Sequence, residues 1–395
     1  MINGKSLEWG RSRSCIRELA AYGTARKAEI GEDKVFDFSI GNPSVPAPQC
    51  VEDALRDIIN TVPAEKLHAY TAAPGRPTLR AAIANDLNSR WNTELKAEHI
   101  YVCCGAAAGL ASCMKALMNP GEQAVVFAPF FAEYRVFVEG AGAELVSVPA
   151  AEHMQPDMES FKQILNEKTG VVIINSPNNP SGVILSAESM KTLADILKEA
   201  EQKYGHPIYL VSDEPYRELI YDDVKLPCVF DYYENSLVIY SFSKSMSLPG
   251  ERIGYVAVNP KMEQWEMAFA AVAGAARCYG YVNPPSMMQM VVERCVGQTA
   301  DISIYKKNRD LLCGGLQSLG FDCVKPDGAF YLFVKCPVPD AKSFSETAKK
   351  YELLLVPGDD FGLQGYVRVA YCVSEETIVN SMPAFKMLAE EYGLI

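Results

Sequence analysis

Residues 237–258 read LVIYSFSKSMSLPGERIGYVAV, and the other motifs of the chain are best understood around this stretch. An apolar run at each end has the composition of a buried β-strand. The turn between the runs carries Ser241, Ser243 and Lys244, and Arg252 follows the lysine by eight residues. A lysine in this setting is suited to forming a Schiff base, and the hydroxyls and the arginine are suited to holding a phosphate. Alone, the stretch also fits a solvated lysine in a loop.

The composition excludes several classes of protein. The chain has 395 residues, enough for two domains, with 49% hydrophobic and 22% charged residues, as in ordinary globular proteins. A net charge of −12 argues against nucleic acid as a partner, because phosphate backbones require a basic face. We find neither an apolar run of membrane-spanning length nor the apolar core of a signal peptide. We therefore expect a cytoplasmic protein with no membrane partner.

The cysteine and histidine patterns indicate a reducing compartment and no metal site. The twelve cysteines are scattered through the chain without a CxxC pair, which favours a reducing compartment over a disulfide framework. The four histidines are far apart and share no ligand spacing. We therefore expect no metal site.

The middle of the chain alternates apolar runs with helical patterns, such as those at 106–118 and 188–204. This alternation predicts a largely parallel sheet with helices on both faces. The predicted strands are 100–104, 124–128, 144–148, 171–175, 208–212, 237–241 and 254–258. The fold class we predict is α/β, with a three-layer large domain around a mostly parallel seven-stranded sheet and a smaller α+β domain.

The two ends of the chain have the mixed pattern of helices and strands that we expect of the smaller domain. After Pro284-Pro285 the pattern predicts helices at 286–319, 343–351 and 375–392 and strands at 329–334 and 366–371. Before residue 45 it predicts a helix from Ser14 to Ile30 and a strand at 35–40, too little to fold alone. The expected division is therefore a large domain of residues 46–284 and a small domain of residues 1–45 and 285–395.

Small and polar residues recur where the predicted strands end, which is where open α/β sheets bind ligands. They are Gly105, Ala106 and Ala107 after one strand, Phe131 after the next, Asn179 after a third, and Asp213 and Tyr216 after a fourth. The small residues open a helix whose free N–H groups attract anions, and an aromatic ring can stack on a flat ligand. Taken singly, the helix start and the aromatic are more often explained by packing.

Six motifs, in their order and content, resemble the fold-type-I pyridoxal-phosphate enzymes. They are FSIGNP (38–43), YTAAPGRPTLR (70–80), NNPSG (178–182), SDEPYRELIYD (212–222), SFSKSMSLPGERIGY (241–255) and VRVAY (367–371). More closely, the chain resembles the class I/II aminotransferases of the aspartate aminotransferase superfamily. The resemblance implies an enzyme that moves the amino group of an L-amino acid to a 2-oxo acid through a pyridoxal/pyridoxamine phosphate ping-pong cycle.

The resemblance also implies a role for each matching residue around the cofactor, pyridoxal 5'-phosphate. Lys244 would hold it as a Schiff base and then act as general acid and base. Asp213 would pair with the protonated pyridine nitrogen and so keep the ring an electron sink. Tyr216 and Asn179 would hydrogen-bond the phenolate oxygen of the ring, and Phe131 would stack on its face.

Phosphate and substrate have their own implied contacts. The phosphate would be held by Gly105, Ala106, Ala107, Ser241, Ser243 and Arg252. Tyr70 would reach the phosphate of the other subunit, which implies a homodimer with shared active sites. Arg368 would bind the substrate α-carboxylate by a planar two-point contact, with Asn179 beside it. Gly41 would let the N-terminal segment approach the substrate closely.

Some alternatives stay open. A C–S β-lyase on the same fold would use the same cofactor, but those relatives usually show an SDEIH-type motif where this chain has SDEPYRE. A cofactor-binding regulator would need an attached DNA-binding domain, and a plain binding protein would leave Lys244, Asp213 and Arg368 as accidents. Arg277 fits either a contact to a substrate side-chain carboxylate or an ordinary interface. We interpret Glu218 as a solvated surface charge.

Overall fold

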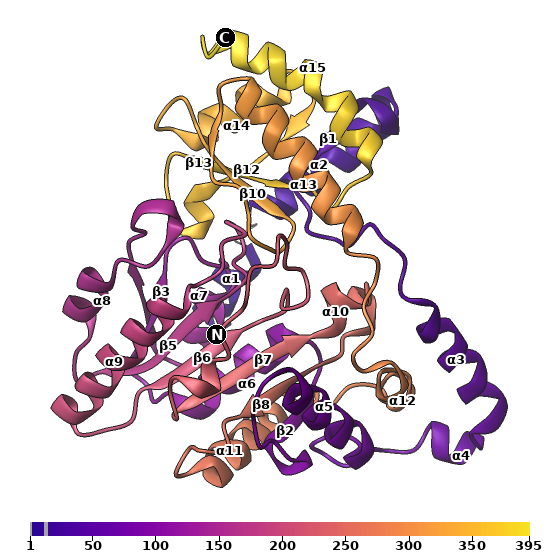
Figure 1. The fold of residues 1–395 in the computed structure, drawn as a ribbon, viewed down its shortest axis with the longest axis vertical. Coiled ribbons are helices and arrows are strands. Elements are labelled where there is room, and N and C mark those ends of the chain that lie inside the picture. Colours follow the sequence, from indigo (N-terminus) through magenta and orange to yellow (C-terminus); the bar gives the residue numbers. More distant parts are fainter. Residues whose placement is uncertain (1, 12–14) are drawn as a thin grey trace.

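A computed structural model describes residues 2–11 and 15–395 (Figure 1). A seven-stranded sheet in the order β2-β8-β7-β6-β5-β3-β4 forms its centre. The strands are β2 Ile100–Cys103, β3 Gln123–Phe127, β4 Glu144–Val148, β5 Thr169–Asn175, β6 Tyr209–Asp213, β7 Ser236–Ser241 and β8 Gly254–Val258. All run in one direction except β8, which is antiparallel to both of its neighbours. The seven predicted strands are confirmed, with ends that differ by one or two residues.

The sheet is buried on both faces because its strands are apolar at consecutive positions. Along β5, Val171 and Ile173 enter one core while Val172 and Ile174 enter the other, as the alternation of side chains in a strand requires. The first core is covered by α6 Ala106–Leu117, α7 Tyr134–Gly140 and α11 Trp265–Cys278. The second is covered by α3 Gln49–Thr61, α5 Pro77–Arg90, α8 Met158–Ile164, α9 Ala187–Tyr204 and α12 Ser286–Cys295. This three-layer arrangement is the predicted one.

The C-terminal part forms a second unit, orange to yellow at the top of Figure 1. Its four-stranded antiparallel sheet has the order β12-β13-β10-β9. The elements are β9 Asp322–Cys323, β10 Tyr331–Lys335, β11 Leu353–Leu354, β12 Val356–Pro357, β13 Tyr366–Ala370, α13 Ser303–Ser318, α14 Ala341–Lys349 and α15 Glu375–Glu391. β1 Phe36–Asp37 joins this unit by pairing in parallel with β11.

The N-terminal segment touches both units. On α1 Gly4–Arg11, the indole of Trp9 donates to Glu139 of α7 at 3.1 Å. On α2 Cys15–Ile30, Arg26 pairs with Glu352 of the C-terminal unit. The predicted start of this helix, Ser14, lies outside the described residues.

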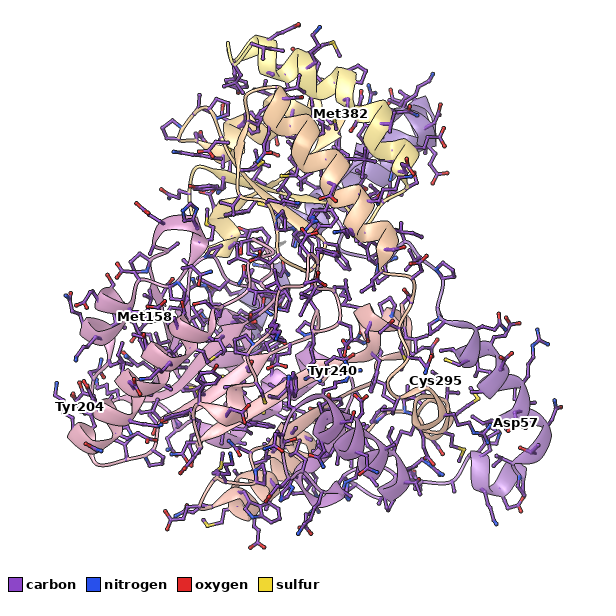
Figure 2. The ribbon with its side chains drawn as sticks, viewed as in Figure 1. Asp57, Met158, Tyr204, Tyr240, Cys295 and Met382 are labelled. Carbon is purple, nitrogen blue, oxygen red and sulfur yellow. The ribbon has the colours of Figure 1, made fainter. Side chains whose placement is uncertain are left out.

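The division into domains stays a prediction, and one contact favours moving its second boundary. Helix α12 packs against α3 (Figure 2). Arg294 of α12 forms an ion pair with Asp57 of α3. Val291 and Val292 of α12 belong to the core under the seven-stranded sheet. The packing therefore favours a boundary after α12 over one at residue 285.

Three predicted elements differ from the observed ones. The single helix at 286–319 is wrong, because α12 and α13 are separated by a turn in which Gly297 has φ 85°. The strand at 35–40 is shorter than predicted: it is β1, Phe36–Asp37, followed by backbone hydrogen bonds of Phe38 to Leu354 and Ala370. The strand at 329–334 begins later, at Tyr331, because Ala329 has φ 57° and cannot continue an extended chain. Within the described ranges, no helix combines the length and the apolarity needed to cross a bilayer.

The remaining helices are short. They are α4 Ala64–Leu67, between α3 and α5, and α10 Phe242–Ser245, which follows β7 directly. Helix α10 has one turn and carries Lys244 at the carboxyl edge of the seven-stranded sheet. The C-terminal unit stands over this edge, so residues of β10 and β13 come close to the ends of β5, β6 and β7.

Candidate active site

A pocket of about 290 Å³ lies at the carboxyl edge of the sheet. It is lined by most of the residues that the sequence singled out: Gly41, Ala106, Ala107, Phe131, Asn179, Asp213, Tyr216, Ser241, Ser243, Lys244, Arg252 and Arg368. Ile16, Leu110, Pro249 and Tyr331 also line it. Of the predicted residues, Gly105 and Tyr70 are outside this lining. Motifs far apart in the sequence thus meet in one space.

Lys244 is half-buried, and its surroundings favour the neutral amine over the ammonium. Its Nζ donates to the carbonyl of Gly41 at 2.6 Å. The Ser241 hydroxyl caps α10 by accepting from the N–H of Ser243 at 3.2 Å, which holds the turn that presents the lysine. Burial lowers the pKa of Lys244 to about 8, and the charges of Arg368 and Arg252 contribute to the lowering. An amine with this pKa is neutral often enough near pH 7 to act as a nucleophile or base.

Asp213 ends β6 as a buried acid with one oxygen satisfied. Its Oδ2 accepts from the hydroxyl of Tyr134 at 2.7 Å. Its Oδ1 is buried and has no hydrogen-bond partner among the described residues. Burial raises the pKa of Asp213 to about 7, although the Tyr134 hydroxyl opposes the rise. A cationic donor beside Oδ1 would satisfy the atom and restore the ordinary ionisation of the carboxyl.

Arg368 on β13 is buried and makes two hydrogen bonds with its guanidinium. Its Nη1 donates to Oδ1 of Asn179 at 3.0 Å, and its Nη2 donates to the carbonyl of Ser39 at 2.6 Å. Its guanidinium lies over the rings of Tyr331 and Phe361, 4.5 and 5.0 Å from their centroids. Its Nε is buried without a partner in the described chain. A planar, buried cation with an unused N–H is suited to a carboxylate.

Several hydrogen-bond donors meet at the start of α6. Gly105, with φ 82°, caps this helix, and a Cβ there would lie 2.9 Å from Nη2 of Arg252. Glycine therefore allows the guanidinium to approach the helix end. The hydroxyls of Ser241 and Ser243 are 2.6 Å apart in the same pocket. The first amides of a helix have no intrahelical acceptor, so this corner offers N–H, hydroxyl and guanidinium donors to an anion.

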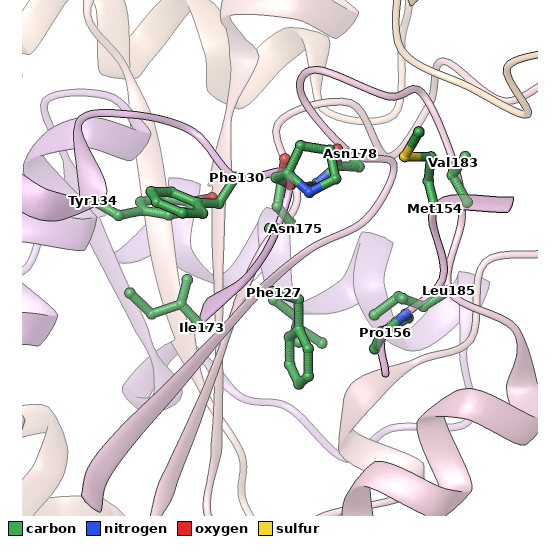
Figure 3. A pocket seen from close by; sticks show the side chains of 13 residues that line it. Phe127, Phe130, Tyr134, Met154, Pro156, Ile173, Asn175, Asn178, Val183 and Leu185 are labelled. Atoms are coloured by element: carbon green, nitrogen blue, oxygen red, sulfur yellow. Dashed lines mark hydrogen bonds between the residues drawn. The ribbon is translucent and has the colours of Figure 1, made fainter. Parts of the chain in front are cut away.

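Three site residues were missed from the sequence: Tyr134, Asn175 and Tyr331. Asn175 donates to the carbonyl of Asp213 at 2.8 Å and accepts from the N–H of Asn179 at 2.7 Å, so it joins two strand ends. Tyr134 and Asn175 also line a second cavity, of about 30 Å³ (Figure 3). The position of Tyr134, one turn after Phe131 at a strand end, was a usable signal. Tyr331 stands in an apolar strand pattern, and that pattern gave no signal of a site residue.

Two further positions need comment. Tyr70 is fully exposed, at 107% of its reference area, and contributes nothing to the pocket of its own protomer. The interpretation of Glu218 as a solvated charge is wrong. Its side chain is 7% exposed, accepts from the Tyr240 hydroxyl at 2.7 Å and pairs with Arg90, because the turn after Asp213 folds back under the sheet. Arg277 is exposed at the end of α11, outside the lining.

The sequence profile of the family described as "Aminotransferase class I and II" matches residues 33–384. The chain belongs to this family. A probable aspartate aminotransferase from Methanocaldococcus jannaschii is 30% identical to it, over 95% of this chain and 97% of that protein. An aminotransferase of known structure from Eubacterium rectale is 48% identical, with a TM-score of 0.97 over 99% of both chains. The aspartate aminotransferase from Thermus thermophilus, solved with maleate, is 25% identical, with a TM-score of 0.87 over 98% of this chain and 100% of that one.

These findings confirm the predicted fold class and the predicted class of enzyme, a pyridoxal-phosphate-dependent aminotransferase of fold type I. The names of the relatives give no support to the C–S lyase alternative. The site also fits the cofactor. The unsatisfied oxygen of Asp213 suits a protonated ring nitrogen, and the corner at Arg252 suits a phosphate.

Proposed function

We propose that this aminotransferase moves the amino group of an L-amino acid to a 2-oxo acid, with Lys244 carrying the proton transfers and Arg368 binding the carboxylate of both substrates. The observation that carries the proposal is the lining of a single pocket. There the amine of Lys244 lies with two buried polar groups, Asp213 and Arg368, that each keep one atom without a hydrogen-bond partner among the described residues. Unsatisfied buried polar atoms are costly, so their presence together favours a bound ligand with complementary groups.

The cofactor would be held at three places by residues of this chain. Asp213 would bind its ring nitrogen, Tyr216 and Asn179 its phenolic oxygen, and Phe131 its ring face. Its phosphate would be bound by Gly105, Ala106, Ala107, Ser241, Ser243 and Arg252. When bound, pyridoxal phosphate supplies an electron sink that stabilises negative charge on the substrate α-carbon. The protein contributes position, charge and proton transfer.

Lys244 has the properties that the proton transfers require. Its lowered pKa allows the amine to accept a proton near neutral pH, and its hydrogen bond to the Gly41 carbonyl orients Nζ inside the pocket. In this proposal Lys244 would also be the residue that holds the cofactor in the resting enzyme. Because Arg252 and Arg368 line the same pocket, the ammonium form is disfavoured and the proton is released readily.

Arg368 would orient the substrate. Asn179 and the Ser39 carbonyl fix the plane of the guanidinium, and Nε is left for a carboxylate oxygen. Gly41 keeps the space beside this group open. A Cβ at Gly41 would lie 1.9 Å from the hydroxyl of Tyr331, so no larger residue fits without displacing that ring.

Two substrate classes have support. The names of the relatives favour aspartate. The side chains of Ile16, Leu110 and Pro249 in the lining favour an amino acid with an uncharged side chain. For aspartate, the second carboxylate would need a cation beyond Lys244, Arg252 and Arg368, which already have roles, and Arg277 of a partner subunit is the candidate from the sequence.

A single-turnover panel tests the proposal. Each amino acid is mixed with the purified holoenzyme, and conversion of the cofactor to its pyridoxamine form is followed by absorbance. We expect conversion with at least one L-amino acid and regeneration with a 2-oxo acid. Accumulation of pyruvate and ammonia from cysteine conjugates, without the pyridoxamine form, would instead identify a lyase. The ratio of rates for aspartate and leucine decides between the two substrate classes.

We also propose a cytoplasmic homodimer in which Tyr70 reaches the phosphate site of the partner. The full exposure of Tyr70 in one protomer supports a role outside its own pocket. Mixing Lys244→Ala subunits with Tyr70→Phe subunits should then produce hybrid dimers with one intact site and more activity than either parent. Activity no greater than the average of the two parents would contradict the shared site.

A further inference from the structure

Tyr331 contacts three groups of the site without having been assigned a role. It begins β10, where it pairs with Ala370 of β13, and its side chain is buried. Its hydroxyl lies 2.9 Å from the hydroxyl of Tyr216, and its ring faces the guanidinium of Arg368 at 4.5 Å. The hydroxyl also occupies the space that a Cβ at Gly41 would need. Tyr331 therefore lies between the arginine that would bind the carboxylate and the phenol that would contact the cofactor.

The direction of the hydrogen bond between the two phenols follows from proton counting. Each phenol has one proton. Burial keeps both neutral, since it raises the pKa of Tyr331 to about 12 and that of Tyr216 well above its usual range. If Tyr216 donates its proton to the phenolic oxygen of the cofactor, Tyr331 must donate to Tyr216. A donor that also accepts a hydrogen bond is a stronger donor, because consecutive hydrogen bonds polarise one another.

Arg368 acts on Tyr331, the first donor in these consecutive hydrogen bonds. Its positive charge faces the ring of Tyr331 and opposes the effect of burial on the phenol, which makes the hydroxyl a better donor. A carboxylate bound to Arg368 neutralises part of that charge. The donor strength of Tyr331, and through it that of Tyr216, should therefore depend on whether the carboxylate site is occupied.

We infer that Tyr331 is a positioning residue that couples occupancy of the Arg368 site to the hydrogen bond Tyr216 makes with the cofactor. The inference rests on the proposed function. A second connection, from Arg368 through Asn179, exists in the same pocket. Tyr331 is separable from it, because Tyr331→Phe removes the hydroxyl and retains an aromatic ring against the guanidinium.

The test is a pH titration of the visible absorbance of the holoenzyme, with and without saturating acetate, a carboxylate that has no amino group to transfer. For Tyr331→Phe we expect the midpoint to rise by about half a pH unit, because a weaker Tyr216 donor stabilises the anionic phenolic oxygen less. We also expect the shift of the midpoint caused by acetate to be no more than about half as large in Tyr331→Phe as in the wild type. An unchanged midpoint and an unchanged acetate shift would overturn the inference.

Matched variants separate this role from a structural one. Tyr371→Phe removes another buried hydroxyl near β10, bonded to the Ala329 carbonyl at 3.2 Å outside the pocket lining, and should leave both titrations unchanged. In a Tyr216→Phe background, Tyr331→Phe should have no further effect, and a further shift there would contradict coupling through Tyr216. Tyr331→Leu removes the ring as well and should weaken acetate binding about three- to fivefold. If the wild type shows no cofactor band, the proposed function fails instead.

Discussion

Two consecutive acids at the carboxyl end of β6, Asp213 and Glu214, have opposite environments. Glu214 accepts from the Ser212 hydroxyl at 2.7 Å and from Nε of Arg217 at 2.9 Å, with both charged side chains 3% exposed. Asp213, as deeply buried, accepts one hydrogen bond from Tyr134 and keeps Oδ1 without a partner in the described chain. One acid is part of a closed ion pair, and its neighbour is left open toward a pocket.

The difference separates residues that support the site from residues that would use it. Arg217 also donates to the Tyr255 hydroxyl at 2.8 Å and lies over the rings of Trp91 and Tyr240, so its charge is compensated by the protein. Lys244 has one carbonyl as its partner in the hydrogen bonds of the described chain. The charge of Arg217 is thus paired within the protein, although its Nη2 is buried without a hydrogen-bond partner in the described chain. Lys244 and Asp213 form no ion pair among the described residues and remain free for a ligand.

The largest expected effect is at the open cation. Lys244→Ala should lower turnover about 10⁴-fold or more, because under the proposed function it would remove both the covalent anchor of the cofactor and the proton carrier. Its unfolding midpoint should stay close to that of the wild type, since the Lys244 ammonium has no buried counter-ion in a salt bridge of the described chain. The check is turnover together with covalent fixation of the cofactor by borohydride. Fixation at another lysine in the variant would refute this role.

The second-largest effect on turnover is expected at Asp213, the acid that is open toward the pocket. Asp213→Asn removes the charge that would balance the protonated ring nitrogen and should lower turnover about 10²- to 10³-fold. The free energy of unfolding of the apoprotein should be unchanged or higher, because an amide is less costly to bury than an unsatisfied carboxyl. Steady-state kinetics and denaturant unfolding measure the two quantities. A large loss of stability with little loss of turnover would place Asp213 with the structural charges.

The place where the open groups gather could be predicted from the sequence, whereas the Glu214–Arg217 pair was not predicted. Lys244, Asp213 and Asn179 follow apolar strands that run parallel, and parallel strands bring their carboxyl ends to one edge. Arg252 reaches the same edge because it precedes the antiparallel strand β8. Local patterns therefore sufficed to bring these residues together.

The contacts that depend on tertiary structure could not be read in the same way. Tyr331 meets Tyr216 only once β10 pairs with β13 over the sheet edge, and an aromatic in an apolar strand carries no mark of that contact. Glu218 reads as a surface charge until the turn after β6 folds under Tyr240. The break at Gly297 was missed, although a glycine followed by polar Gln298 and Thr299 is a usable signal for the end of a helix.

The closed pair should affect stability more than chemistry. Glu214→Gln leaves the buried Arg217 without its counter-ion, which typically costs about 3–5 kcal/mol of unfolding free energy. Turnover of the folded fraction should fall only a few-fold, because Glu214 lies outside the pocket lining. Denaturant unfolding of Glu214→Gln beside Asp213→Asn provides the comparison. If Glu214→Gln abolished turnover without destabilising the protein, the separation of the two acids would be wrong.

The smallest effect is a dependence on pH that only the open acid should produce. In the apoprotein, burial raises the pKa of Asp213 from 3.8 to about 7, so between these values the folded state binds more protons than the unfolded state. The contribution of this group to stability is therefore fully present below about pH 4 and is lost as the pH rises to about 7, by roughly 2–4 kcal/mol. The difference in unfolding free energy between wild type and Asp213→Asn isolates it, since the other groups titrate in both. Binding of pyridoxal phosphate should flatten this difference, because a cation beside Oδ1 returns the pKa of the carboxyl toward its ordinary value. A slope that persists unchanged in the holoenzyme would mean that the ring nitrogen is not the partner of Asp213.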